Sequence, residues 1–277
     1  MRVVFWYQCG EIDEIGTGHR FRSRFIGEQL TQRGHEVTYI EDNDVVADNY
    51  DVMIIDHINP PKDISKRAKS MGMKVVVIDG KDPVADISIS AFLNDDADYK
   101  GIMYATFPVS PYSMKYDSDN GSDIAFVGMG GFDKNNYAKV VLEILMEMKI
   151  NAIVTHSINH PDFKKEFPGV EVFCGNNYCD AMNKCLFAIT NGGLTFFQAL
   201  HFGIPTIAIP QYEHQVTNIS AVNCCCISCC PDKNDISASV HIMANSKCRR
   251  RDLSVLSQHY IDGRGVERIC NIIEEIE

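Results

Sequence analysis

The chain has 277 residues, of which 45% are hydrophobic and 23% charged, and its formal net charge at pH 7 is −11. This composition is that of a globular protein, and the length favours two domains that each bury a core of their own. Both halves of the chain are acidic, so no basic surface is available for counterion-release binding. The sequence therefore predicts no nucleic-acid partner.

No apolar stretch approaches the ~18 residues needed to cross a bilayer. The start of the chain also lacks the apolar core and the small-residue cleavage site of a secretory signal. There are 11 cysteines, but nothing in the sequence indicates secretion, so reduced thiols are the better interpretation. We expect a cytoplasmic protein without stable membrane insertion.

Apolar runs of strand length alternate with helical patterns in the first part of the chain. Runs rich in Val and Ile predict buried strands at 2–7, 36–40, 51–55 and 74–78. Helical spacing predicts two helices between them, at 20–33 and 62–71, each followed by a glycine that typically ends a helix. The pattern weakens over 93–120, which we interpret as a linker.

The alternation then begins again. It predicts strands at 123–128, 151–155, 170–173, 186–190 and 205–209, helices at 134–148, 194–202 and 215–223, and an amphipathic helix at 263–277. Alternating strands and helices indicate an α/β fold with parallel sheets covered on both faces. We predict two doubly wound Rossmann-type domains, 1–117 and 118–277, with a cleft between them. Ligands of such sheets bind beyond the carboxyl ends of the strands.

The first loop of interest follows strand 2–7 and contains Gly16, Gly18 and His19. Phe21 stands where a dinucleotide-binding fingerprint would have its third glycine, so that motif is absent. The dipole at a helix N-terminus disfavours an imidazolium, so a histidine in the first turn suits a general base. The alternative is a histidine that only caps or packs at the helix start.

Two further loops carry polar residues after a predicted strand. Asp56 and His57 close the third strand, and Asp56 fits a helix cap or turn former at least as well as a functional carboxylate. Gly130, Gly131 and Asp133 follow the strand at the start of the second half. Here the glycines either let a ligand approach or form a tight turn that Asp133 caps.

The strongest anion-site candidate is a strand that enters a glycine pair and then a helix. Its residues are Asn191, Gly192, Gly193, Leu194 and Thr195. Several amide N–H groups could converge on a phosphate there, and Gln198 lies one turn further on the same face. The alternative is a glycine turn for close packing. His214, Gln215 and Asn218 follow the next strand and could reach the same ligand.

The segment Cys224–Cys230 contains C-x-x-C spacing, which raises zinc or redox chemistry. There is no second C-x-x-C or His pair at the spacing of a structural zinc site, so we interpret these thiols as small hydrophobic residues of a short strand. We predict no metal. Arg249–Arg251 is interpreted as a solvated helix start.

The order of these motifs resembles a known family. The chain contains G-x-G-H-x-x-R near its start, Asp-His after a strand, then M-G-G-x-D-x-x-N, N-G-G-x-T, H-Q-x-x-N and D-G-R-G. This order resembles the UDP-sugar hydrolases of the pseudaminic-acid pathway and the related spore-coat polysaccharide proteins, which have the GT-B fold. The part from Met182 to Asn223 is also similar to the peptidoglycan N-acetylglucosaminyltransferase.

The resemblance implies an enzyme that binds a UDP-sugar and releases UDP by reaction at the anomeric carbon, with no metal or other cofactor. His19 matches the family's base, which takes a proton from water. The nucleotide diphosphate would contact Asn191, Gly192, Gly193, Leu194, Thr195, Gln198 and Gln215. The rest of the substrate would contact Gly16, Gly18, Arg22, Asp56, His57, Gly130, Gly131, Asp133, His214 and Asn218.

Three departures from the family's pattern keep other functions open. Ile58 stands where the hydrolases have Tyr, His214 where they have Asn, and Gln198 where many GT-B members have Glu. One alternative is a glycosyltransferase that passes the sugar from UDP to a hydroxyl acceptor. Another is a nucleotide-sugar-binding subunit that has lost catalysis.

Overall fold

The computed structural model of the chain describes residues 1–7, 18–41, 49–57, 63–80, 82–91, 96–109, 116, 122–155, 163–173 and 178–276. The chain forms two compact units. Unit 1 is Met1–Phe107 with Gly263–Glu277, and unit 2 is Pro108–Asp262. No helix in the described part of the chain combines the length and the apolar character that a membrane span requires.

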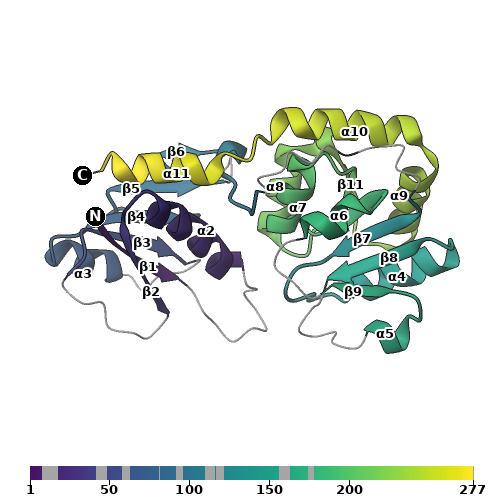
Figure 1. The fold of residues 1–277 in the computed structure, drawn as a ribbon, viewed down its shortest axis with the longest axis horizontal. Coiled ribbons are helices and arrows are strands. Elements are labelled where there is room, and N and C mark those ends of the chain that lie inside the picture. The colour runs from purple at the N-terminus through teal and green to yellow at the C-terminus, as the bar shows by residue number, and fades with distance from the viewer. Residues whose placement is uncertain are drawn as a thin grey trace. The chain divides into compact units, whose positions relative to one another are not determined.

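Unit 1 is built on a parallel six-stranded sheet with the strand order β2-β1-β3-β4-β5-β6 (Figure 1). The strands are β1 (Arg2–Tyr7), β2 (Glu36–Glu41), β3 (Val52–Asp56), β4 (Lys74–Ile78), β5 (Ile87–Ser90) and β6 (Tyr99–Lys100). The helices are α2 (Gly18–Gln32), α3 (Ile64–Ser70) and α11 (Gly265–Glu274), with a 3-10 turn at Ile102–Tyr104. The four strands predicted for this part of the chain are confirmed.

Both faces of the sheet in unit 1 are covered, as the continuous apolar runs predict. On one face, Val3 and Phe5 of β1 join the core that α2 and α11 complete. On the other face, Val4 and Trp6 join the core that contains Ala68 of α3. Neighbouring residues of one strand therefore serve two separate cores, because successive side chains point to opposite faces.

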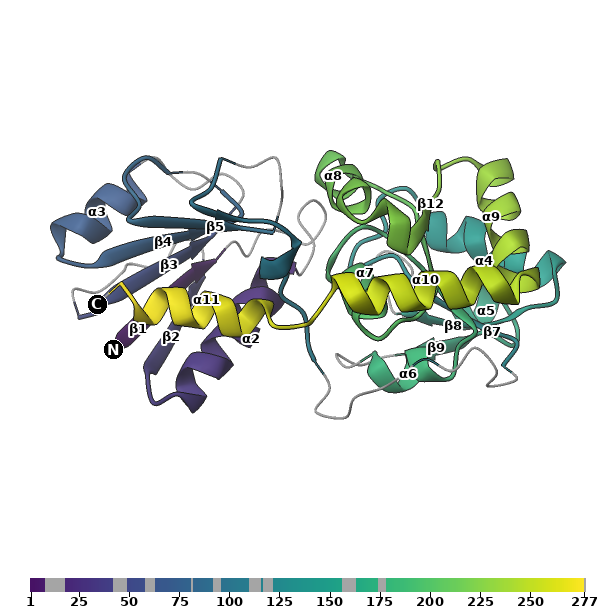
Figure 2. The same ribbon diagram turned by 90° about the horizontal axis from the view of Figure 1, so that it is seen from above.

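The C-terminal helix belongs to unit 1, whereas the sequence-based division placed it in a second domain of 118–277. Figures 1 and 2 both show α11 lying beside α2. Ile269 of α11 is buried in the core of unit 1. Glu274 accepts hydrogen bonds from Arg33 Nη1 at 2.7 Å and contacts His35 Nε2 at 2.8 Å. Apolar burial and this ion pair together hold the C-terminal helix on unit 1.

Unit 2 repeats the architecture with the strand order β12-β11-β10-β7-β8-β9, again parallel throughout. Its strands are β7 (Ile124–Gly128), β8 (Asn151–Thr155), β9 (Glu171–Phe173), β10 (Phe187–Thr190), β11 (Thr206–Ala208) and β12 (Cys226–Ser228). Its helices are α4 (Tyr137–Glu147), α5 (Phe163–Glu166), α6 (Cys179–Asn183), α7 (Leu194–His201), α8 (Glu213–Ala221), α9 (Lys233–Asn245) and α10 (Lys247–Tyr260), with a 3-10 turn at Asn223–Cys225.

The structure tests the interpretations of the cysteine-rich segment and of the arginine run. Cys226 begins β12, and Cys225 and Cys229 are buried beside it, which confirms the interpretation as a short apolar strand for these three residues, whereas Cys224 and Cys230 are exposed. Within the described ranges, no group of three or more His, Cys, Asp or Glu side chains is arranged to hold a metal ion. The arginine prediction is wrong for Arg250, which is buried and donates Nη1 to the Met243 carbonyl at 2.7 Å.

Candidate functional site

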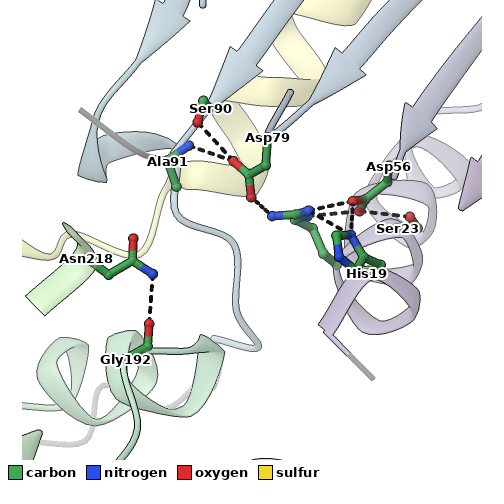
Figure 3. Close-up of polar contacts among 9 residues, drawn as sticks. His19, Ser23, Asp56, Asp79, Ser90, Ala91, Gly192 and Asn218 are labelled. Carbon is green, nitrogen blue, oxygen red and sulfur yellow. Dashed lines mark hydrogen bonds and ion pairs between the residues drawn. The ribbon is translucent and has the colours of Figure 1, made fainter. Parts of the chain in front are cut away.

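Asp56, the last residue of β3, is the centre of a charged cluster in unit 1 (Figure 3). Its side chain is fully buried. Arg22 donates Nε to Asp56 Oδ2 at 2.8 Å and Nη2 to Oδ1. Ser23 Oγ donates to Oδ2 at 3.2 Å, and His19 Nδ1 lies 2.6 Å from Oδ1. Every partner comes from the beginning of α2, where residues at i, i+3 and i+4 share one face.

The charge state of Asp56 follows from these partners. Burial disfavours the carboxylate, but the charge and hydrogen bonds of Arg22 and the contact with His19 outweigh it and hold the pKa of Asp56 well below its ordinary value. The carboxylate is therefore ionised at neutral pH and can only accept hydrogen bonds.

The tautomer of His19 follows from the same contact. Because Asp56 can only accept, the His19 nitrogen at 2.6 Å must carry the proton, so Nδ1–H donates to Oδ1. In a neutral imidazole the other nitrogen, Nε2, then keeps its lone pair. A histidine oriented in this way by a buried carboxylate is suited to take a proton from a hydroxyl group.

Asp79 completes the cluster and was missed by the sequence analysis. It follows β4 directly and adopts a left-handed backbone conformation with φ of +52°. Its Oδ2 accepts from Arg22 Nη1, while Oδ1 accepts from the Ala91 amide at 3.0 Å and from Ser90 Oγ at 3.1 Å. A carboxylate directly after an apolar strand is a signal that could have identified it, since Asp tolerates the left-handed region.

The other site residues predicted for unit 1 are placed differently. His57 is 8% exposed and its ring stacks on Trp6 with 5.0 Å between centroids, so it packs against the core. Gly18 is the first residue of α2, and a Cβ there would meet no other atom within 4 Å. Gly16 and Ile58 lie outside the described residues.

In unit 2, side-chain amides join three loops at the carboxyl ends of β7, β10 and β11. Asn191 Nδ2 donates to the Met129 carbonyl at 2.9 Å, and Gln211 Nε2 donates to the same carbonyl at 2.8 Å. Asn218 Nδ2 from α8 donates to the Gly192 carbonyl at 2.7 Å (Figure 3). These bonds fix the turn that leads into α7, and none of them uses an ionised group.

The glycines of these loops serve close packing. A Cβ on Gly192 would lie 2.7 Å from the carbonyl oxygen of Gln215, so the approach of α8 requires glycine there. Gly130 has φ of +87°, and a Cβ on it would lie 2.9 Å from Asn191 Nδ2. The packing interpretation therefore accounts for both residues. It leaves the N-terminus of α7 available to a ligand.

The first turn of α7 retains donors for an anion. Gly193, Leu194 and Thr195 are partly exposed, and no side chain caps the helix. The Gly193 amide differs from the expectation, since it already donates to Asn191 Oδ1 at 3.1 Å. The amides of Leu194 and Thr195 belong to the first turn, where no intrahelical acceptor exists. The donors that remain are therefore those two amides and the helix dipole.

Asp133 and Gln198 have protein partners of their own. Asp133 is fully buried and accepts from the amides of Tyr137 at 3.1 Å and Ala138 at 2.7 Å, so its side chain caps the first turn of α4, although the N-cap residue is Asn136 and not Asp133. Gln198 is 1% exposed and donates Nε2 to the Pro108 carbonyl at 3.1 Å. Burial of its side chain leaves little surface for a ligand.

The remaining predicted residues lie around the start of α8. Gln215 Oε1 accepts from the Gln211 amide at 2.9 Å, and the His214 ring stacks on Tyr212 with 5.5 Å between centroids. Gly131 is partly exposed in the loop after β7. The structure thus places His214, Gln215 and Asn218 in the first turns of α8, whose Gln215 and Asn218 contact the glycine turn before α7.

Three buried oxygens of unit 2 lack a hydrogen-bond partner among the residues that the structure describes. They are Thr190 Oγ1, Gln211 Oε1 and Asn218 Oδ1. All three belong to the carboxyl end of the sheet or to the loop and helix that follow it. Buried polar atoms are rarely left unpaired in folded proteins, so these oxygens are candidate contacts for a bound ligand.

Comparison of the sequence with known proteins does not identify a family. No protein-family profile matches the chain. An uncharacterised protein of Methanocaldococcus jannaschii is 22% identical over 73% of this chain and 54% of its own length, so the chain spans about half of that curated relative.

Solved structures match nearly the whole chain. The spinosyn forosaminyltransferase SpnP has a TM-score of 0.69 at 13% identity, covering 100% of this chain and 99% of that one. MurG of Acinetobacter baumannii has a TM-score of 0.68 at 12% identity, covering 99% and 100%. S. aureus MnaA, solved with UDP, has a TM-score of 0.67 at 12% identity, covering 99% and 96%. The chain has the GT-B fold, as the resemblance in the order of its motifs implied.

Proposed function

We propose that the protein is a GT-B enzyme that transfers the sugar of a UDP-sugar to a hydroxyl acceptor, with His19 as the general base. The observation that carries this proposal is the pairing of His19 with the buried, ionised Asp56 at the end of β3. The similarity in fold to a named sugar transferase and to a protein solved with UDP supports the substrate class. No cofactor besides the substrate's own nucleotide enters the proposal.

Unit 2 is proposed to bind the diphosphate. The uncapped first turn of α7 supplies the amides of Leu194 and Thr195 and the positive end of the helix dipole. Such dipoles stabilise charge that develops on a leaving group, because they are already oriented before the reaction begins. The unpaired oxygens of Gln211 and Asn218 would accept hydrogen bonds from the hydroxyl or N–H groups of the nucleotide or sugar.

The proposed reaction moves one proton and one glycosyl group. Nε2 of His19 takes the proton of the acceptor hydroxyl while Nδ1–H remains bonded to Asp56. The acceptor oxygen forms a bond to the anomeric carbon. The bond from that carbon to the phosphate oxygen breaks, and UDP leaves with the electron pair.

A second candidate is hydrolysis, in which water takes the place of the acceptor. The order of the sequence motifs, which resembles the UDP-sugar hydrolases, favours this candidate. The comparisons favour the transferase, since a sugar transferase is among the similar structures. The residues proposed for each step are the same in both reactions.

The acceptor separates the two candidates. A panel of UDP-sugars, each incubated with and without a panel of hydroxyl acceptors, would be followed by phosphorus NMR for UDP release. A transferase releases UDP only when an acceptor is present, whereas a hydrolase releases it in buffer alone. UDP binding without release in either arm would support a binding subunit, and absence of UDP binding would contradict the proposed substrate class.

A further inference from the structure

We propose that Lys134 binds the diphosphate of the nucleotide, and that its ammonium moves from the ring of Tyr212 to the phosphate groups when the nucleotide binds. The inference rests on the proposed function, in which the first turn of α7 holds the diphosphate of a UDP-sugar. It adds a cation to a site whose other donors are neutral amides. Lys134 belongs to the loop after β7, and its Nζ lies over the Tyr212 ring, 5.5 Å from the ring centre.

The contact between Lys134 and Tyr212 joins loops on either side of the turn that leads into α7. Lys134 follows β7 and Tyr212 follows β11, and β10 lies between these two strands in the sheet. The turn that begins α7 follows β10. A side chain that reaches from the loop after β7 to the loop after β11 therefore passes the end of β10, where this turn lies.

Hydrogen bonds show how closely the three loops approach one another. The Met129 carbonyl accepts from Asn191 Nδ2 at 2.9 Å and from Gln211 Nε2 at 2.8 Å, so the loops after β7, β10 and β11 meet at one atom. Asn191 Oδ1 accepts in turn from the amide of Gly193, the N-cap residue of α7, at 3.1 Å. Tyr212 is the next residue after Gln211, so the ammonium over its ring lies beside the loops that position the first turn of α7.

Buried oxygens without a partner are an independent indication that these loops hold a ligand. Thr190 ends β10 with a fully buried side chain, and Asn218 is 5% exposed and donates Nδ2 to the Gly192 carbonyl (Figure 3). Within the described part of the chain, Thr190 Oγ1 and Asn218 Oδ1 accept no hydrogen bond. Buried polar atoms are normally paired. A molecule with hydroxyl or N–H groups beside a phosphate would satisfy these oxygens and the helix amides together.

Lys134 is the cation that these loops provide. Four described loops follow a strand of unit 2, namely 129–136, 191–193, 209–212 and 229–232. Lys134 is the only lysine or arginine in them. No described carboxylate forms an ion pair with it, whereas Lys233 at the start of α9 lies 3.6 Å from Glu147. The neutral amides can orient a diphosphate, but they cannot balance its charge.

The contact with Tyr212 is suited to a ligand-free position of the ammonium. Lys134 is exposed, and a cation–π contact at an exposed site is weak, so the ammonium can exchange it for a phosphate oxygen. A charge-assisted hydrogen bond to phosphate is stronger than a neutral one, and the flexible stem of lysine lets the ammonium move. The negative charge of the diphosphate increases as UDP leaves, so the same ammonium stabilises the departing group.

The test is Lys134→Met, with binding measured by calorimetry for three probes: UDP, inorganic pyrophosphate and uridine. Methionine keeps an unbranched side chain but has no charge, and the exposed position leaves the core unchanged. We expect the affinities for UDP and pyrophosphate to fall about 10-fold, as the loss of one hydrogen bond to a charged group predicts. Uridine has no phosphate, so its binding should not differ between the two proteins. High ionic strength should reduce the differences for UDP and pyrophosphate.

Lys184→Met is the matched control. Lys184 is also an exposed lysine of unit 2, but it precedes β10 and so lies at the opposite end of that strand from the turn. The variant loses the same charge and should bind UDP and pyrophosphate as the wild type does. Lys134→Arg keeps a cation at the loop, so it should bind both probes nearly as tightly as the wild type.

A Lys134→Met variant that binds UDP and pyrophosphate as tightly as the wild type would overturn the inference, and would leave the proposed function intact. An equal loss of affinity in Lys184→Met would also overturn it, because the effect would then be one of net charge. Weaker pyrophosphate binding by Lys134→Met alone, in a protein that turns over no UDP-sugar, would retain the phosphate contact and refute the enzyme assignment. A wild type that binds neither UDP nor pyrophosphate would refute both.

Discussion

The ends of the two sheets use different chemistry on the same architecture. In unit 1, the end of β3 is surrounded by ionisable side chains, namely Asp56, Asp79, Arg22 and His19. In unit 2, the turn after β10 is held by neutral amides, Asn191 and Asn218 among them, which bond to backbone carbonyls. Titratable groups can move a proton, whereas backbone dipoles can bind an anion without changing charge.

This contrast is consistent with the proposed reaction, in which each unit has its own task. A buried carboxylate needs partners that keep it ionised, and unit 1 supplies them from α2 and from the loop after β4. A diphosphate needs donors that are already oriented, and unit 2 supplies a helix N-terminus. A substitution in one unit therefore leaves the other as a reference.

The largest expected effect in unit 2 is that of Gly193→Val on ligand binding. A Cβ on Gly193 would meet only the Asn191 side chain, with 3.1 Å to Oδ1, and the backbone has φ of −98°, so the fold should tolerate valine. The added methyl groups would obstruct the first turn of α7. We expect UDP at 100 times its Kd, which stabilises the wild type by about 2.7 kcal/mol, to lose this effect in the variant. Thermal unfolding with and without UDP measures it.

Gly192→Ala provides the contrast to that variant. A Cβ on Gly192 would lie 2.7 Å from the carbonyl oxygen of Gln215, so α8 would have to move. We therefore expect a lower melting temperature even without UDP. An unchanged response of a folded Gly193→Val variant to UDP would remove the first turn of α7 from the proposed site.

We expect a smaller effect on the free energy of unfolding when the pH is lowered, and this effect arises in unit 1. The pKa of Asp56 is lowered in the folded protein because Arg22 and His19 outweigh the effect of burial. A group with a lowered pKa contributes stability above its ordinary value of 3.8, and this contribution is lost as the pH falls below that value. The free energy of unfolding should fall with acidification, and less steeply in Asp56→Asn. If the free energy of unfolding fell equally steeply with acidification in both proteins, the lowered pKa of Asp56 would be contradicted.

We expect a metal chelator to have no effect on the stability of the protein. The buried thiols of Cys225 and Cys226 each have a pKa raised to about 12, mainly by burial, so they stay protonated and are poor metal ligands. Purified protein should contain no stoichiometric zinc, and its melting temperature should not change with chelator. One zinc per chain that is lost together with the fold would show that the segment is a metal site.

Local patterns predicted many of the strands and helices, but not β5 or β6, and β6 lies within 93–120, which the sequence analysis wrongly interpreted as a linker. The apolar runs predicted β1 and β4 with the bounds that the structure has, and both predicted helix ends are glycines with positive φ, Gly34 and Gly72. Each of these features depends on residues close together in the chain. Periodicity and backbone preference are properties of such short segments.

Features that depend on distant parts of the chain were not predictable in this way. Arg22 and Asp79 are 57 positions apart, and the bond between them exists only because β4 ends near the start of α2. Arg250 looks like a surface residue in a run of charges, yet it satisfies carbonyls at the end of α9. The sequence did place His19 after the first predicted strand and Asp56 at the end of the third, but it did not predict that these strands are neighbours and did not pair the two residues.

In the proposed reaction, unit 1 supplies the base and unit 2 binds the nucleotide. The most direct test is His19→Asn, with turnover and UDP affinity measured on one preparation. Asparagine keeps a polar side chain but cannot take up a proton, so we expect turnover to fall ~10²–10⁴-fold while UDP affinity changes little. Turnover near that of the wild type, or UDP affinity that falls as far as turnover does, would contradict this division between the units.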